Sequence, residues 1–247
     1  MPFVTAGDPD LKFTKELLLE LDKLKPGLFE IGFPYSDPIA DGPVIQASYT
    51  RALSKQLKVD QILETMESLN SQMTQPRVAM VCYAIVMRYG VQRFLERARQ
   101  AGFSGLIVPD LLWTEDQTFQ KQCHEHGLHL IPLITPTTPR PRAQWLAQQA
   151  TGFIYYVSVA GVTGERTSLP PELIENLTWL RSQTDVPVCV GFGVSGPTQV
   201  QQLKDHCDGL IVGSAVMKRI AAASEGVPRD QVLQQVRDFV AELVDVA

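Results

Sequence analysis

Residues 188–215 read VCVGFGVSGPTQVQQLKDHCDGLIVGSA and contain one structural pattern twice. In each copy a short apolar run, first at residues 188–191 and then at 209–212, ends in a glycine-containing turn that opens a helical pattern, at residues 198–206 in the first copy. Runs that are apolar on both faces are typical of strands buried in a parallel sheet. The stretch therefore predicts two neighbouring parallel strands joined by a right-handed helical crossover.

The same alternation continues along the whole chain of 247 residues. Six further strands are expected at residues 3–6, 28–32, 78–83, 105–108, 129–134 and 153–157. Helical patterns are expected at residues 11–24, 44–55, 60–71, 91–101, 114–126, 141–149, 171–183 and 229–246. About eight alternations favour an α/β fold, the closed (β/α)8 TIM barrel, with a doubly wound open sheet as the alternative. No linker or break in composition divides the chain, so residues 1–247 are expected to form a single domain.

The composition is that of an ordinary globular protein, with 45% hydrophobic and 20% charged residues. The net charge of −5 argues against a nucleic-acid partner, which requires a basic face. No apolar run approaches the roughly 20 residues that span a bilayer, and the first residues do not resemble a signal peptide, so no membrane association is expected. The 4 cysteines lie far apart without a CxxC pattern, which indicates reduced thiols and a cytoplasmic protein.

One carboxylate interrupts the second expected strand. Alternation of side chains turns Phe29 and Ile31 toward the helices and Glu30 toward the barrel interior. An ionised carboxylate there is costly without a partner, so Glu30 is a candidate catalytic residue with a perturbed pKa; the alternative is a strand-end glutamate in solvent or in a structural ion pair. The loop of residues 33–43 follows with three prolines and Asp41. Asp41 is either a turn residue or the second member of an acid–base pair with Glu30.

Glycine-containing turns follow the seventh and eighth expected strands. Residues 191–196 fit the GxGxxG pattern, but a dinucleotide-binding fold carries it after the first strand, and the next strand here ends without an acidic residue for a ribose. That fold is therefore rejected. In barrels, the loops after strands seven and eight commonly bind phosphate through backbone N–H groups at a helix N-terminus. Each glycine alone is typical of a tight turn, but the two turns together predict a phosphate site.

The segment of residues 158–168 follows the sixth strand and is long, small and polar. Such a segment is typical of a mobile lid over an active site or of a flexible surface loop. Tyr155, in the strand before it, is expected to face inward, where its hydroxyl needs a partner or a wet cavity.

A group of cysteine, histidine and glutamate side chains at residues 123–126, with His129, has the residue types of a metal site. It lies at the end of the helix expected at residues 114–126 and in the turn after it, on the face opposite the predicted site. A solvated helix end is therefore expected here, and no metal.

A set of motifs, in order along the chain, resembles the tryptophan synthase alpha chain family, close to its cyanobacterial and plastid members. The motifs are PFVTAGDP at residues 2–9, EIGFPYSDP at 30–38, ADGP at 40–43, IQ at 45–46, VPD at 108–110, the segments 158–164 and 191–195, and GSA at 213–215. The similarity runs essentially from end to end. The segment 30–46 is highly specific, whereas the glycine motifs are shared by many phosphate-binding barrels.

This resemblance implies a carbon–carbon lyase that cleaves a small phosphate ester, indole-3-glycerol phosphate, to indole and glyceraldehyde 3-phosphate by a retro-aldol reaction. It implies that indole passes to a beta subunit in an α2β2 assembly for tryptophan biosynthesis. Pyridoxal phosphate is then expected only in the beta subunit, and no cofactor in this chain. Two alternatives stay open, a stand-alone lyase that releases free indole and a catalytically impaired member that acts as a partner-binding subunit. The implied compartment is the cytoplasm, or the plastid stroma if the source is a photosynthetic eukaryote.

The resemblance also implies roles for single residues. Glu30 matches the general acid–base residue of the family, and Asp41 matches the carboxylate that holds the indole N–H. The positions that match residues lining the substrate site are Phe3, Ile107, Ile134, Tyr155, Thr163 and Phe192. The positions that match the phosphate cradle are Gly164, Gly193, Gly213 and Ser214. No Schiff base is expected, because the sixth strand has no lysine.

Some positions depart from the family pattern. Most members have an asparagine after the third strand, in a Tyr-x-Asn pattern, but residues 82–90 lack it and are one residue shorter. Leu112 stands where a proline is usual, and Val159 where some bacterial members have arginine. We therefore expect the chemistry of Glu30 and Asp41 to be kept and the coupling to a partner to be altered.

The first expected strand begins at residue 3, whereas the family usually has about one more helix before it. Such a helix would cover the floor of the barrel, where stability is set. The expectation is therefore a TIM barrel that lacks the usual N-terminal capping helix, with its catalytic end complete.

Overall fold

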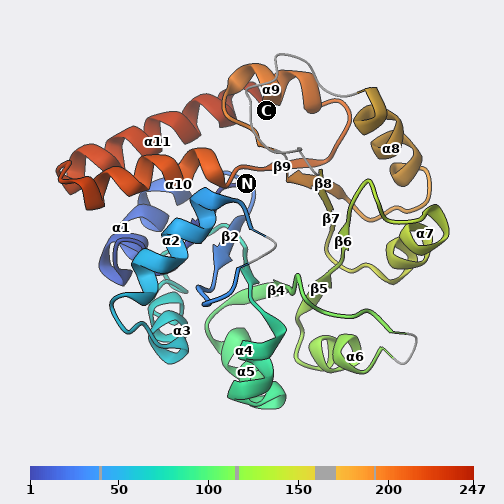
Figure 1. The fold of residues 1–247 in the computed structure, drawn as a ribbon, viewed down its shortest axis with the longest axis horizontal. Coiled ribbons are helices and arrows are strands. Elements are labelled where there is room, and N and C mark those ends of the chain that lie inside the picture. The colour runs from blue at the N-terminus through green and yellow to red at the C-terminus, as the bar shows by residue number, and fades with distance from the viewer. Residues whose placement is uncertain (39–40, 115–116, 159–170, 192) are drawn as a thin grey trace.

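The structure is a computed structural model that describes residues 1–38, 41–114, 117–158, 171–191 and 193–247 (Figure 1). Strands and helices alternate along it. The strands are β1 (Phe3–Thr5), β2 (Phe29–Gly32), β3 (Arg77–Met80), β4 (Phe103–Ile107), β5 (His129–Ile131), β6 (Leu133–Ile134), β7 (Ile154–Val157), β8 (Val188–Gly191) and β9 (Gly209–Ile211). The helices are α1 (Leu11–Asp22), α2 (Pro43–Leu53), α3 (Val59–Glu67), α4 (Tyr83–Tyr89), α5 (Val91–Gln100), α6 (Thr118–Glu125), α7 (Arg140–Gln149), α8 (Pro171–Arg181), α9 (Pro197–Leu203), α10 (Ser214–Ala221), the 3-10 helix η1 (Ala222–Glu225) and α11 (Arg229–Val246).

All strand pairs are parallel, with β1 to β5 in order in one sheet and β6 to β9 in order in the other. The strand expected at residues 129–134 is divided into β5 and β6 at Pro132, which has no N–H to donate to a neighbouring strand. At the other seam, the N–H of Phe3 donates to the carbonyl of Val212 at 3.0 Å, and the N–H of Val212 donates to the carbonyl of Met1 at 2.9 Å. The strands thus close into a ring with the helices around it (Figure 1), which confirms the TIM barrel and excludes the open sheet.

The longer helices bury apolar side chains against the outside of the barrel, as α1 illustrates. The side chain of Asp10 accepts the N–H of Phe13 at 2.9 Å and so begins the helix, while Leu17, Leu18 and Leu21 are fully buried. The last helix, α11, lies against α1 and α10 and brings the end of the chain back to its beginning (Figure 1). Within the described ranges, no helix combines the length and the apolar character needed to cross a membrane.

Two helix starts differ from the sequence prediction. Residues 81–83 were expected in the third strand, but Tyr83 begins helix α4. The carboxylate of Asp110, in the loop after β4, accepts the N–H of Tyr83 at 2.7 Å and so caps α4 from outside its own segment. A helix was expected from residue 114, but α6 begins only at Thr118, because Gln117 before it has a left-handed backbone with a φ of 52°.

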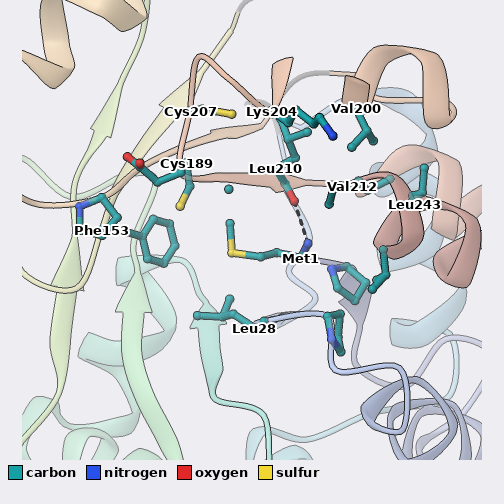
Figure 2. A pocket seen from close by; sticks show the side chains of 18 of the residues that line it. Met1, Leu28, Phe153, Cys189, Val200, Lys204, Cys207, Leu210, Val212 and Leu243 are labelled. Carbon is teal, nitrogen blue, oxygen red and sulfur yellow. Dashed lines mark hydrogen bonds between the residues drawn. The ribbon is translucent and has the colours of Figure 1, made fainter. Parts of the chain in front are cut away.

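A cavity of about 560 Å³ lies at the amino ends of the strands, on the floor of the barrel (Figure 2). Leu28, Phe153 and Gly209 line it where β2, β7 and β9 begin, and Leu243 of α11 lines one side. The amino group of Met1 points across it and donates to the carbonyl of Leu210 at 2.8 Å, as Figure 2 shows. The catalytic residues expected from the sequence lie in the opposite direction, toward the carboxyl ends of the strands.

Candidate active site

Glu30 lies in the middle of β2, paired with Phe3 of β1 and Val78 of β3. Its side chain is 1% exposed, and neither carboxyl oxygen has a hydrogen-bond partner among the described residues. Burial, and to a smaller extent the charge of Asp41, raises the pKa of Glu30 from 4.5 to about 8, while the amino group of Met1 acts in the opposite direction. Glu30 is therefore protonated at neutral pH and can serve as an acid.

Asp41 lies in the loop that leads into α2. Pro43 begins this helix, a position that proline favours because its missing N–H has no partner there in any case. From the first turn of α2, the side-chain amide of Gln46 donates to the carbonyl of Asp41 at 2.7 Å and to that of Pro38 at 3.1 Å, which fixes the loop to the helix. The hydroxyl of Tyr35 donates to Oδ2 of Asp41 at 3.3 Å. Burial raises the pKa of Asp41, and the hydrogen bond from Tyr35 opposes this shift.

Two tyrosines that the sequence reasoning did not assign to the site lie beside these carboxyl groups. The rings of Tyr35 and Tyr49 are tilted against each other with their centroids 5.5 Å apart. Tyr49 projects from α2 and is 1% exposed, and burial together with the charges of Asp41 and Glu30 raises its pKa well above 10. Tyr35 could have been found from its place in the specific loop motif. Tyr49 gave no signal, because one aromatic residue in a helical pattern normally indicates a core position.

Phe3 lies beside both the strand of Glu30 and the expected phosphate turn. A Cβ atom on Gly32 would lie 2.5 Å from Cζ of Phe3 and 3.1 Å from the hydroxyl of Tyr49, and a Cβ atom on Gly213 would lie 3.6 Å from Cβ of Phe3. Gly32, two residues after Glu30, thus leaves the space that the ring of Phe3 needs. The structure brings the predicted substrate residue Phe3 next to the strand of Glu30.

Tyr155 on β7 faces the barrel interior, as the alternation predicted. Its pKa is raised well above 10 by burial and by the charges of Glu30 and Asp41. A Cβ atom on Gly191 would lie 2.5 Å from the ring and from the hydroxyl of Tyr155, so this glycine makes room for the ring on the neighbouring strand β8.

The predicted residues Ile107 and Ile134 are both buried at the carboxyl ends of their strands, β4 and β6. In the register of β6 and β7, Ile134 is paired with Tyr156, whereas Leu133 is paired with Tyr155. Leu133, which the sequence reasoning did not single out, is therefore the neighbour of Tyr155 on this strand.

The expected phosphate turns follow the adjacent strands β8 and β9. Gly213 directly precedes α10, whose first residue is the exposed Ser214. The first N–H groups of a helix have no partner within it and can bind an anion. Gly193 is exposed, and, its chain neighbours aside, no described residue has an atom within 4 Å of where its Cβ would be. Three further predicted site residues lie outside the described residues: Thr163, Gly164 and Phe192.

In the described part of the chain, no three side chains of histidine, cysteine, aspartate or glutamate are placed to hold a metal ion. His126, in the cluster singled out in the sequence, has its Nδ1 atom 2.8 Å from the carbonyl of Gln122 at the end of α6. His129 is exposed at the start of β5. These side chains therefore lie at the floor side of the barrel and away from Glu30.

Comparison with known proteins gives matches along the whole chain. Residues 1–246 match the family described as tryptophan synthase alpha chain. The tryptophan synthase alpha chain of Rhodopirellula baltica is 49% identical over 228 residues, which cover 91% of this chain and 82% of that protein. The one from Picosynechococcus sp. is 45% identical over 244 residues, covering 98% of this chain and 91% of that protein.

Solved structures give the same result. The tryptophan synthase A-subunit of Pyrococcus furiosus superposes with a TM-score of 0.89 and 34% identity, over 99% of this chain and 96% of that one. A chain in a tryptophan synthase complex from the same organism superposes with a TM-score of 0.89 and 33% identity, over the same shares of the two chains. The chain therefore belongs to the tryptophan synthase alpha chain family.

Proposed function

We propose that this chain cleaves indole-3-glycerol phosphate to indole and glyceraldehyde 3-phosphate, with Glu30 as the general acid–base and Asp41 as the carboxylate that holds the indole N–H. The carbon–carbon lyase reaction is that of the family to which the chain belongs. The observation that supports these two roles is the pair of carboxyl groups in different environments. Glu30 is buried and protonated, while Asp41 accepts a hydrogen bond from Tyr35.

The two carboxyl groups suit the two needs of a retro-aldol reaction, a proton for indole carbon C3 and an anion beside the indole nitrogen. Protonation of indole carbon C3 by Glu30 allows the bond from C3 to the glycerol chain to break, and positive charge develops on the indole nitrogen. Asp41, held by Tyr35 and by the start of α2, is a preplaced anion for that charge. The glycerol hydroxyl that becomes the aldehyde loses a proton, which the ionised Glu30 can accept, directly or through water. Glu30 is then protonated again for the next cycle.

The phosphate group of the substrate would lie at the turns after β8 and β9. Gly213 and Ser214 offer the free N–H groups of α10, and Gly193 lies in the turn of the adjacent strand. Phe3, which contacts Gly213 on one side and Gly32 on the other, would lie between the phosphate and the indole ring. Thr163, Gly164 and Phe192 are proposed to contribute to the same site on the basis of the family pattern.

The proposed partner is a beta subunit in an α2β2 assembly, which would hold pyridoxal phosphate and convert indole to tryptophan. A solved relative is described as a tryptophan synthase complex, which supports such a partner. Two large apolar side chains in the segments that follow β3 and β4 are exposed, Met87 of α4 at 54% and Leu112 at 79%. Such exposure suits a surface that another protein covers. Equal rates of indole release with and without any beta subunit would instead favour a stand-alone lyase. We also propose that this chain acts in the cytoplasm, or in the plastid stroma if the source is a photosynthetic eukaryote.

The direct test is incubation of the purified chain with indole-3-glycerol phosphate and measurement of released indole. The wild-type chain should release indole, and Glu30→Gln and Asp41→Asn should each lower the rate by at least about 100-fold, because each removes a group that acts on a developing charge. Glu64→Gln, an exposed glutamate on α3, is the matched control and should keep the wild-type rate. Circular dichroism checks that all variants are folded. A wild-type rate in either site variant would refute its proposed role.

A further inference from the structure

Tyr49 has a hydroxyl group that the chemistry described above does not use. It lies on α2, outside the barrel wall, but its side chain reaches over the carboxyl end of β2, because its hydroxyl is 3.1 Å from where a Cβ on Gly32 would be. The side chain is 1% exposed, and its hydroxyl has no hydrogen-bond partner among the described residues. A buried hydroxyl without a partner destabilises the folded protein, so its presence calls for a reason.

The unpaired donor lies close to unpaired acceptors. Both carboxyl oxygens of Glu30 also have no partner in the described part of the chain, whereas Asp41 already accepts the hydroxyl of Tyr35. Gly32, beside the hydroxyl of Tyr49, is two residues after Glu30 on β2, so the two positions are on the same face of the strand, the face from which the Glu30 side chain projects. Of the two carboxyl groups, Glu30 is the one that lacks a donor.

The reaction gives Glu30 a need for such a donor. Each time Glu30 passes its proton to the substrate, it becomes an ionised carboxylate inside the barrel, and an ion without a partner is costly there. A hydroxyl that donates to this carboxylate would stabilise the ionised form without adding a charge to the site. Tyr49 can supply one, since its own proton is held firmly by its raised pKa.

We propose that Tyr49 is a positioning residue of this site: its hydroxyl donates a hydrogen bond, directly or through one water molecule, to the carboxylate that Glu30 becomes after it has given up its proton. The proposal rests on the proposed function for the acid role of Glu30. Tyr49 acts through Glu30 and is not expected to contact the substrate.

Other groups also face Glu30 and set the background against which Tyr49 acts. They are Asp41 in the loop before α2, the amino group of Met1 at the barrel floor, and Tyr155 on β7. None of them is changed in a Tyr49→Phe variant, so a shift in the pKa of Glu30 in that variant reports on the hydroxyl of Tyr49 alone.

The experiment is a titration of Glu30 by NMR, with carbon-13 in the glutamate carboxyl groups and Glu30→Gln to assign the signal. In Tyr49→Phe the pKa of Glu30 should rise by about one unit, because the ionised form loses a hydrogen bond to a charged group. The value of kcat should fall about tenfold and the acid–base limb of its pH profile should move in the same direction, with KM within about twofold of the wild-type value. Tyr156→Phe, a buried tyrosine on the other face of β7, is the control and should leave the titration unchanged.

If Tyr49→Phe does not fold, 3-fluorotyrosine at position 49 keeps the shape and makes the hydroxyl a stronger donor. The pKa of Glu30 should then fall. An unchanged titration of Glu30 in the folded variants overturns the role of Tyr49, even if the wild-type chain releases indole. Conversely, if the wild-type chain releases no indole but the titration shifts as expected, the proposed function fails and the link between Tyr49 and Glu30 stands.

Discussion

Glu30 keeps its proton to about pH 8 because burial removes the water that would solvate its ionised carboxylate, and the charge of Asp41 adds to this effect. Asp41, only a short distance along the chain, lies nearer the mouth and receives a hydrogen bond from Tyr35. Burial raises the pKa of Asp41 as well, but the hydrogen bond from Tyr35 favours its ionised form. The proposed roles, Glu30 as a proton donor and Asp41 as an anion, thus depend on the places of the two residues in the fold.

The raised pKa of Glu30 makes stability depend on pH in a definite direction. In the unfolded chain Glu30 loses its proton near its usual pKa of 4.5, whereas the folded chain holds the proton to about pH 8. Between these values unfolding releases one proton, so rising pH favours the unfolded state by about 1.4 kcal/mol per pH unit. Between pH 5 and pH 8 we expect the free energy of unfolding of the wild type to fall, relative to that of Glu30→Gln, by about 1.4 kcal/mol for each pH unit.

Urea unfolding of both proteins at several pH values measures this difference, and the comparison cancels the titration of all other groups. Parallel pH dependences for the two proteins would contradict a buried, protonated Glu30.

At the level of residues, the sequence was informative where a polar side chain broke an apolar run. Glu30 was predicted on that ground, and its burial is confirmed. Tyr49 could not be predicted in the same way, because an aromatic residue on a helix gives no sign of the direction it takes once the helix has packed. Its place near Glu30 depends on how α2 lies on β2, a tertiary contact.

At the level of elements, the apolar strands were predicted well because each is buried on both faces and so carries almost no polar residue. The helix α4 was missed. Its segment has no capping residue of its own, and its first N–H is bound by Asp110, which lies in the loop after the next strand. A helix that depends on a cap so distant in sequence cannot be recognised from a local pattern.

The cap of α4 by Asp110 gives a prediction at this scale. In Asp110→Ala the N–H of Tyr83 loses its acceptor, and the thiol of Cys82, which donates to the same carboxylate at 2.9 Å, loses it too. We expect a loss of about 1 kcal/mol in the stability of α4, in the usual range for a helix cap. Hydrogen exchange at the amides of residues 83–86 should become several-fold faster.

Asp205→Ala, which removes an exposed aspartate after α9, is the control and should leave these amides unchanged. Unchanged exchange in Asp110→Ala would mean that α4 is held by its packing and not by the cap.

At the level of the whole molecule, the barrel closes at one seam through hydrogen bonds between the first residues and β9, and it is continuous at the other seam through Pro132. Two sheets joined in this way predict cooperative unfolding of one domain. The 3 tryptophans, Trp113, Trp145 and Trp179, all follow β4, so their fluorescence does not report directly on the elements from β1 to β4.

We therefore expect tryptophan fluorescence and far-ultraviolet circular dichroism, which reports on all helices, to give the same midpoint of urea unfolding. Two separate midpoints would show that the halves of the barrel unfold independently and would contradict a single domain.

The protonated Glu30 also changes the count of charges that an approaching substrate meets. The formal net charge of −5 treats every glutamate as an anion. With Glu30 neutral at pH 7, the folded chain carries one negative charge fewer, and the charge is missing from the inside of the site itself. A phosphate ester is an anion, so the barrel mouth repels it less than the sequence implies. The burial that keeps Glu30 protonated therefore also increases the rate at which the substrate associates.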